Sequence, residues 1–125
     1  GFAVQGGDAG GTGSGGATIW SNNPYPLEAD SSLRHYAGAL CAAFAQGGEV
    51  TGGNSQFYFV TALPDSVDET MQQQLRDNGY SDEQVSAYAA AGGLPYLDNT
   101  DTVFGQVYAG MDVVEQIAGV PTVKK

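Results

Sequence analysis

The sequence of 125 residues contains one cysteine and one histidine, and this scarcity excludes several kinds of site. Cys41 cannot form a disulfide within the chain, and one cysteine with one histidine cannot supply the nitrogen and sulfur ligands of a zinc site. Cys41 lies in the apolar run 39–45, which predicts a buried structural thiol rather than a reactive one. A serine triad would have to use His35, whose place beside that run favours a hydrogen-bonded packing role. We therefore expect no bound metal and no cofactor.

Basic residues are also few. The sequence contains four basic residues (lysine and arginine together) and 14 acidic residues (aspartate and glutamate together), which gives a formal net charge of −10. This charge repels nucleic-acid phosphates and anionic membrane surfaces, so neither is an expected partner. No apolar run approaches the roughly 18 residues of a membrane span. The compartment stays open between the cytoplasm and a bacterial cell surface.

Length and composition fit one globular domain, with 42% hydrophobic and 14% charged residues. The 19 glycines follow no collagen period, so they mark turns and tight loops. The cluster 11–16 matches G-x-G-x-x-G, but the Asn- and Pro-rich stretch after it cannot form the helix that a dinucleotide site needs. Residues 98–101 lack the glycine and the distal glutamate of a calcium loop. We expect them to form a solvated turn.

The hydrophobic pattern predicts a mostly β chain. Apolar and β-branched residues predict strands over 35–45, 56–61 and 102–107, after a short apolar start at 2–5. A polar, glycine-rich loop is expected over 46–54. Near the end of the chain, apolar residues at an i, i+3 spacing predict a short amphipathic helix over 111–118.

Residues 65–92 differ in character and predict a helical hairpin. Ser66 and Glu69 have the spacing of a capping box, and Asn78-Gly79 is a good stop for the helix that the box would begin. Residues 81–84 repeat the box and begin an alanine-rich segment. Two short helices joined at 78–80 are therefore expected within the β protein.

Aromatic, amide and glycine groups remain once these exclusions are made, and they suit a reaction that breaks no covalent bond. Several blocks of sequence then resemble the cyclophilin family, in the family's order. The first, GFAVQGGD followed by GTGSGG, is similar to G-F-x-x-Q-G-G-D…G-T-G-x-G-G. The later blocks are GALCAA at 38–43, NSQFYF at 54–59, and LD…VFGQV…GMDVV over 97–114. Together they run across nearly the whole chain.

The resemblance implies a cyclophilin-like antiparallel β-barrel, which is closed by eight strands with a helix at each open end in that family. Here the barrel is expected to be incomplete. The family's first strands and first helix have no counterpart before Gly1, and its closing strand has none beyond Val120. Residues 1–125 then form a single domain with a helical insertion at 65–92 and a C-terminal helix.

The activity that the resemblance implies is peptidyl-prolyl cis-trans isomerisation in protein folding. Its partners would be proline-containing peptides and unfolded protein clients. The X-Pro bond keeps a rotation barrier of about 18–20 kcal/mol because amide resonance must be lost. A catalyst has to bind the twisted state better than the planar isomers. In the family an arginine donates to the prolyl nitrogen, an apolar pocket holds the ring, and amides hold the flanking backbone.

Residue by residue, the resemblance places Phe2, Tyr58 and Leu97 around the proline ring. Gln5 would orient the arginine and the peptide backbone, so Gln5 and Phe2 carry the catalytic assignments. The remaining peptide-binding residues line the groove, and they are Gln56, Ala43 and Phe44. Read without the resemblance, Phe2 and Leu97 would be core residues, and Gln5 and Gln56 satisfied turn amides.

Some positions depart from the family pattern. Phe44 stands where an asparagine is usual, Tyr58 where a phenylalanine is, and Asp101 where many members have histidine. The strand with the family's F-H-R motif has no counterpart, and Arg34 and Arg76 lie outside the motifs. Little catalysis is therefore expected from these residues alone.

Two further hypotheses remain. One is a non-catalytic module that binds proline peptides in the same groove. The other is that the acidic insertion 65–92 shapes which peptides enter or docks a partner. Cyclosporin-like inhibitors are a further ligand class that the resemblance raises, and Tyr96, where some inhibitor-sensitive members have tryptophan, leaves their binding open.

Overall fold

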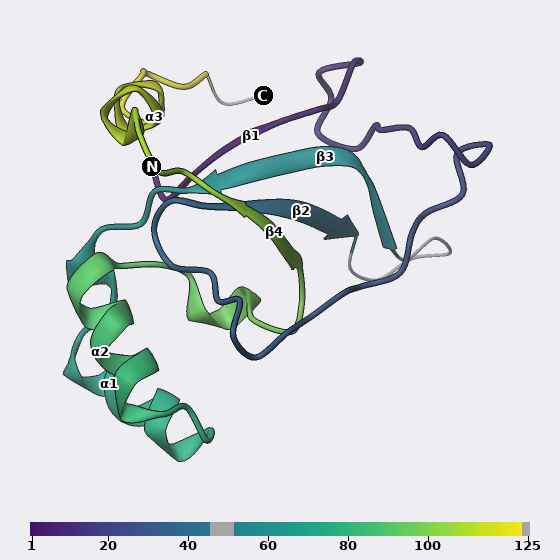
Figure 1. Ribbon diagram of the computed structural model, residues 1–125. Coiled ribbons are helices and arrows are strands. Elements are labelled where there is room, and N and C mark those ends of the chain that lie inside the picture. Colours follow the sequence, from purple (N-terminus) through teal and green to yellow (C-terminus); the bar gives the residue numbers. More distant parts are fainter. Residues whose placement is uncertain (46–51, 124–125) are drawn as a thin grey trace.

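The computed structural model describes residues 1–45 and 52–123, which form one sheet and three helices (Figure 1). The sheet is antiparallel, with strand order β1-β3-β2-β4. Its strands are β1 (Ala3–Gly6), β2 (Ala39–Ala45), β3 (Gly52–Val60) and β4 (Thr102–Gln106). The helices are α1 (Glu69–Asp77), α2 (Asp82–Ala91) and α3 (Met111–Ala118), with short 3-10 turns η1 (Pro64–Ser66) and η2 (Pro95–Leu97).

One face of the sheet carries the core. Tyr58 on β3 lies opposite Gln5 on β1 and Cys41 on β2, so these three side chains share a face. Cys41 is fully buried, as expected for a structural thiol. The buried cluster on this face comprises Ala39, Cys41, Tyr58, Val60, Ala62 and Leu94, with Ala3, Ala43, Leu97 and Val103 packed against it.

The opposite face is only partly covered. Phe57 and Phe59 contact each other edge to face there, and Phe57 remains 37% exposed. Phe104 on the edge strand β4 is 58% exposed. Within the described ranges the sheet ends at β1 and β4 and does not close, which confirms the expected open, incomplete barrel.

The helical hairpin forms as predicted, with one different cap (Figure 1). Asp68, not Ser66, begins α1, and its carboxylate accepts a hydrogen bond from the Met71 amide. Ser66 lies in η1 instead, where its hydroxyl donates to the Leu63 carbonyl. Ser81 begins α2 with the full capping box to Gln84, as predicted. A second buried cluster holds the hairpin together, formed by Val67, Leu75, Val85 and Tyr88.

The two turns of the hairpin depend on left-handed backbone. Gly79 follows α1 with a φ of 85°, and Gly92 follows α2 with a φ of 82°. Both values lie in the region that favours glycine. The predicted stop at Asn78-Gly79 is therefore confirmed. No described helix is long and apolar enough to cross a membrane.

Three other expectations need correction. The second strand begins at Ala39 rather than at residue 35, because the chain turns through residues 36–38 before it pairs with β3. Of the loop expected at 46–54, residues 52–54 belong to β3, and 46–51 lie outside the described residues. Asp98 and Asp101 are not solvated, since they are 8% and 7% exposed. Both buried carboxylates accept hydrogen bonds, which offset the cost of removing their charges from water.

Candidate proline-peptide groove

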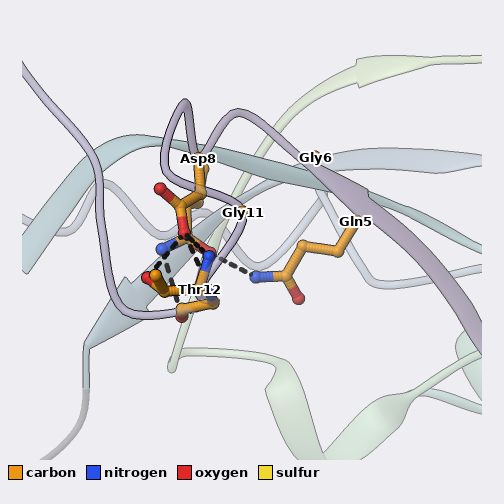
Figure 2. A pocket seen from close by; sticks show the side chains of 7 residues that line it. Gln5, Gly6, Asp8, Gly11 and Thr12 are labelled. Atoms are coloured by element: carbon orange, nitrogen blue, oxygen red, sulfur yellow. Dashed lines mark hydrogen bonds between the residues drawn. The ribbon is translucent and has the colours of Figure 1, made fainter. Parts of the chain in front are cut away.

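A glycine-rich loop follows β1 and wraps around the Asp8 carboxylate (Figure 2). The backbone amides of Gly10, Thr12 and Gly13 donate to it at 2.8–2.9 Å, and the Thr12 hydroxyl donates at 3.0 Å. The bonds from Gly13 and Gly10 contribute most to lowering the pKa of Asp8 to about 2. The carboxylate thus fixes the loop and occupies the amides of Gly10, Thr12 and Gly13.

Gln5 and Gln56 form an amide pair beside this loop. Nε2 of Gln5 donates to Oε1 of Gln56 over 2.7 Å, and Nε2 of Gln56 donates to the carbonyls of Gly13 and Gly15. Gln56 is 8% exposed, so its amide is held by the loop, whereas Gln5 is exposed. Figure 2 shows the Gln5 side chain reaching from β1 toward the hydrogen bonds around Asp8.

A hollow of about 460 Å³ lies at the amide pair and the loop. Gln5 and Gln56 line it together with Asp8 and the loop glycines. In the described part of the chain, Oε1 of Gln5 accepts no hydrogen bond, so it can accept one from another group. The structure thus brings together Gln5 and Gln56, which the resemblance assigned to one groove without predicting a bond between them.

Tyr58 lies next to Gln5 on the same face and has its hydroxyl bound to a carboxylate. The hydroxyl donates to Oδ2 of Asp101 over 2.7 Å, and Oδ1 of Asp101 lies 3.3 Å from the Phe44 amide that donates to it. Burial, followed by the hydrogen bond to Asp101, raises the pKa of Tyr58 far above its ordinary value. The two departures from the family pattern therefore complement each other, since Asp101 satisfies the hydroxyl that Tyr58 adds.

The remaining predicted groove residues differ in their surroundings. Ala43 and Leu97 are half-buried and both pack against the cluster that contains Tyr58. The Phe44 ring lies edge to face on Tyr25, with centroids 5.6 Å apart. Phe2 precedes β1 and is 62% exposed, and it makes no ring contact with another described aromatic residue.

Sequence reasoning missed a buried network centred on Asp98, the residue after Leu97. Oδ1 of Asp98 accepts from the backbone amide and Nδ1 of His35 at 2.9 and 2.7 Å. Oδ2 accepts from the hydroxyls of Tyr80 and Tyr88 at 2.7 and 2.6 Å. Burial alone would raise the pKa of Asp98, but these hydrogen bonds outweigh it and hold the pKa below its ordinary value. The predicted packing role of His35 is thus confirmed, and its partner is Asp98.

The described arginines are engaged away from the amide pair. The Arg34 guanidinium lies 4.4 Å from the centroid of the Tyr80 ring, and Nε of Arg76 lies 3.7 Å from Asp82. In residues 1–45 and 52–123, no three His, Cys, Asp or Glu side chains come together in a way that could hold a metal ion.

Comparison with known proteins identifies the family. The family model described as cyclophilin type peptidyl-prolyl cis-trans isomerase matches residues 1–125. The chain belongs to the cyclophilin family. A protein of Staphylococcus saprophyticus, named as a candidate peptidyl-prolyl cis-trans isomerase, is 43% identical over 117 residues. A relative with the same designation from Staphylococcus epidermidis is 39% identical over 117 residues.

Solved cyclophilins share the fold. A cyclophilin-type isomerase of Cryptosporidium parvum matches with a TM-score of 0.66 and 22% identity, over 99% of this chain and 58% of that one. A second structure of that protein, in the presence of the dipeptide Ala-Pro, matches equally with 23% identity. The two staphylococcal matches each cover 94% of this chain but 56% of the relative. This cyclophilin chain thus spans little more than half the length of the relatives that it matches.

Proposed function

We propose that these residues provide most of the substrate groove of a peptidyl-prolyl cis-trans isomerase that acts on proline-containing segments of unfolded proteins. The observation that carries the proposal is the Gln5–Gln56 amide pair, held at 2.7 Å on the face that also holds Tyr58. Ala43 and Leu97, which pack against the same cluster, supply apolar walls for a proline ring. The Ala-Pro dipeptide used with the Cryptosporidium parvum protein is consistent with a ligand of this class.

The groove performs this reaction by binding the twisted X-Pro bond, and no covalent bond changes. Rotation becomes faster when the twisted amide is bound more tightly than either planar isomer. In this scheme Gln56 is held by the glycine-rich loop, and it holds Gln5 in turn. The exposed Gln5 then has its carbonyl oxygen available to orient a guanidinium or a peptide amide. Phe2, which is 62% exposed, precedes β1 and covers the proline from there.

The arginine that donates to the prolyl nitrogen in the family is the component that these residues do not supply. Arg34 lies over the Tyr80 ring, and Arg76 lies beside Asp82 at the exposed surface of the helical hairpin. We therefore expect weak peptide binding and little rate enhancement from this chain by itself. Full activity requires a flanking segment with an arginine that can reach Gln5.

The test is a proline-isomerisation assay on this chain and on an extended chain. The extended chain is the same sequence continued N-terminally through an arginine-bearing strand and C-terminally through a closing strand. Acceleration by the extended chain alone supports the proposal. A matched variant of the extended chain with the arginine replaced by lysine controls for folding. If neither chain accelerates exchange but both bind a proline peptide saturably, the groove is a non-catalytic binding module and the isomerase proposal is wrong.

A further inference from the structure

A second hollow of about 500 Å³ lies between α1 and the 3-10 turn η2. Figure 1 shows the helical hairpin projecting from the sheet, while η2 lies between α2 and β4 along the chain. The hairpin contributes Met71, Gln74 and Leu75 to the walls, and the segment after α2 contributes Tyr96 and Asn99. Leu75 is 5% exposed and belongs to the core of the hairpin, so the hollow has a fixed apolar base.

The chemistry of the walls suits a polypeptide. Met71 and Tyr96 add apolar surface next to Leu75. Within the described residues, the side-chain amides of Gln74 and Asn99 make no hydrogen bond, so both can pair with the backbone of an extended chain. The single charged residue among the walls is Asp98, and both of its oxygens are already satisfied. The hollow therefore favours a neutral, apolar side chain and offers no cation for an anionic ligand.

The hollow is continuous in sequence with the proposed proline pocket. Tyr96 and Asp98, which line the hollow, directly flank Leu97, which packs on the Tyr58 cluster. The Asp98 carboxylate receives Tyr80 and Tyr88 from the hairpin, so the hairpin and the Leu97 turn are held together as one unit. A chain bound at Leu97 can continue past Tyr96 into the hollow, because Tyr96 adjoins Leu97 and itself lines the hollow.

We propose that this hollow is a second subsite that accepts an apolar side chain of the client polypeptide, some residues away from the proline. The amides of Gln74 and Asn99 bind the client backbone there. The inference rests on the proposed isomerase function and extends it, because it makes the helical hairpin a determinant of which client segments are preferred. Short peptides cannot reach the subsite, whereas longer ones can.

The experiment compares peptides of two lengths on the extended chain. The short peptide has two residues before the proline and one after it. Two long peptides of about twelve residues are used, one with a leucine before the proline and one with a leucine after it. Gln74→Trp fills the hollow and Gln74→Ala removes one amide. The matched controls are Gln73→Trp and Gln73→Ala, at an exposed neighbouring position of α1 that does not line the hollow. Both kcat/KM and the equilibrium Kd are measured, so the subsite is tested even if catalysis fails.

For at least one long peptide, Gln74→Trp should lower kcat/KM and raise Kd by about three- to tenfold, as expected for loss of a hydrogen bond and an apolar contact. The short peptide and the Gln73 variants should be unchanged. An equal effect on short and long peptides, or none on any, overturns the subsite. Gln74→Ala removes the amide without filling the hollow, so if Gln74→Trp lowers the melting temperature while Gln74→Ala changes no Kd, the subsite is also overturned. If the unmodified extended chain accelerates the isomerisation of no peptide, the isomerase proposal is refuted separately. The Kd values of the Gln74 variants then still show whether the subsite binds the long peptides.

Discussion

The hydroxyl of Tyr88 offers a direct test of the Asp98 network. It donates to Oδ2 of Asp98 over 2.6 Å, and the Tyr88 side chain is fully buried. Tyr88→Phe removes one hydrogen bond to a charged group and keeps the ring. Such a bond contributes about 1.5–3 kcal/mol. We expect the free energy of unfolding of the extended chain to fall by that amount, and its melting temperature by about 3–10 °C.

The matched control is Tyr96→Phe, which removes a hydroxyl from a side chain that is 62% exposed. In the described part of the chain this hydroxyl makes no hydrogen bond, so the expected change is within about 0.5 kcal/mol. Urea unfolding followed by circular dichroism measures both variants. If Tyr88→Phe and Tyr96→Phe unfold at the same urea concentration, the buried carboxylate does not stabilise the hairpin and the reasoning is refuted.

The same network predicts a pH dependence. The pKa of Asp98 is lower in the folded protein than its ordinary value, so its ionised form stabilises the fold. That contribution is complete above the unfolded pKa of about 3.9 and is lost as the pH falls toward the folded pKa. The stability difference between the parent chain and Tyr88→Phe should therefore be constant from about pH 7 to 5 and narrow below about pH 4. A difference that stays constant down to about pH 2.5 would contradict this assignment.

Three other outcomes are expected. The Asp8 carboxylate accepts a hydrogen bond from the Gly13 amide, so Asp8→Ala should speed hydrogen exchange at that amide. In the parent chain, the slow exchange of the Gly13 amide should be lost only as the pH falls toward 2, because the pKa of Asp8 is about 2. In the extended chain, Gln56→Leu should lower kcat/KM about tenfold, while Gln116→Leu on α3 has no effect; equal losses would show a general effect on folding. Cys41 should not react with a thiol reagent at pH 8 unless the chain is unfolded, because burial raises its pKa to about 12; rapid labelling of the native protein would contradict its burial.

Local patterns predicted most of the elements. The alternation and β-branching around 56–61 identified the centre of β3, and the i, i+3 spacing identified α3 with its ends at Met111 and Ala118. Ser81 was predicted as a cap because both halves of its capping box are close in sequence. Ser66 was predicted for the same reason and was wrong, because Pro64 begins a 3-10 turn there and Asp68 is better placed to cap α1.

Long-range hydrogen bonds could not be predicted in this way. Asp98 and Asp101 look like turn residues, and nothing local distinguishes them from solvated aspartates. Their burial depends on Tyr58 and Tyr88, which other elements bring to them. The family resemblance assigned Gln5 and Gln56 to one groove, but the hydrogen bond between them was not predicted, since 51 residues separate the two amides. The roles of Phe2, Ala43, Phe44 and Leu97 in substrate binding remain predictions for the assays above.

The turn at the tip of the helical hairpin, at Gly79, has more space for added side-chain atoms than the turn at its base, at Gly92 and Gly93. At the base, a methyl group added to Gly92 would collide with the Ala62 carbonyl, and one added to Gly93 with the His35 carbonyl. At the tip, a methyl group added to Gly79 would meet open space. Gly79 itself is still favoured by its φ of 85°, and Tyr80 is bound to Asp98, so the tip can vary at the exposed Asn78, which lines the second hollow, while the base keeps its geometry. The lining of the second hollow can therefore change at the tip without loss of the fold.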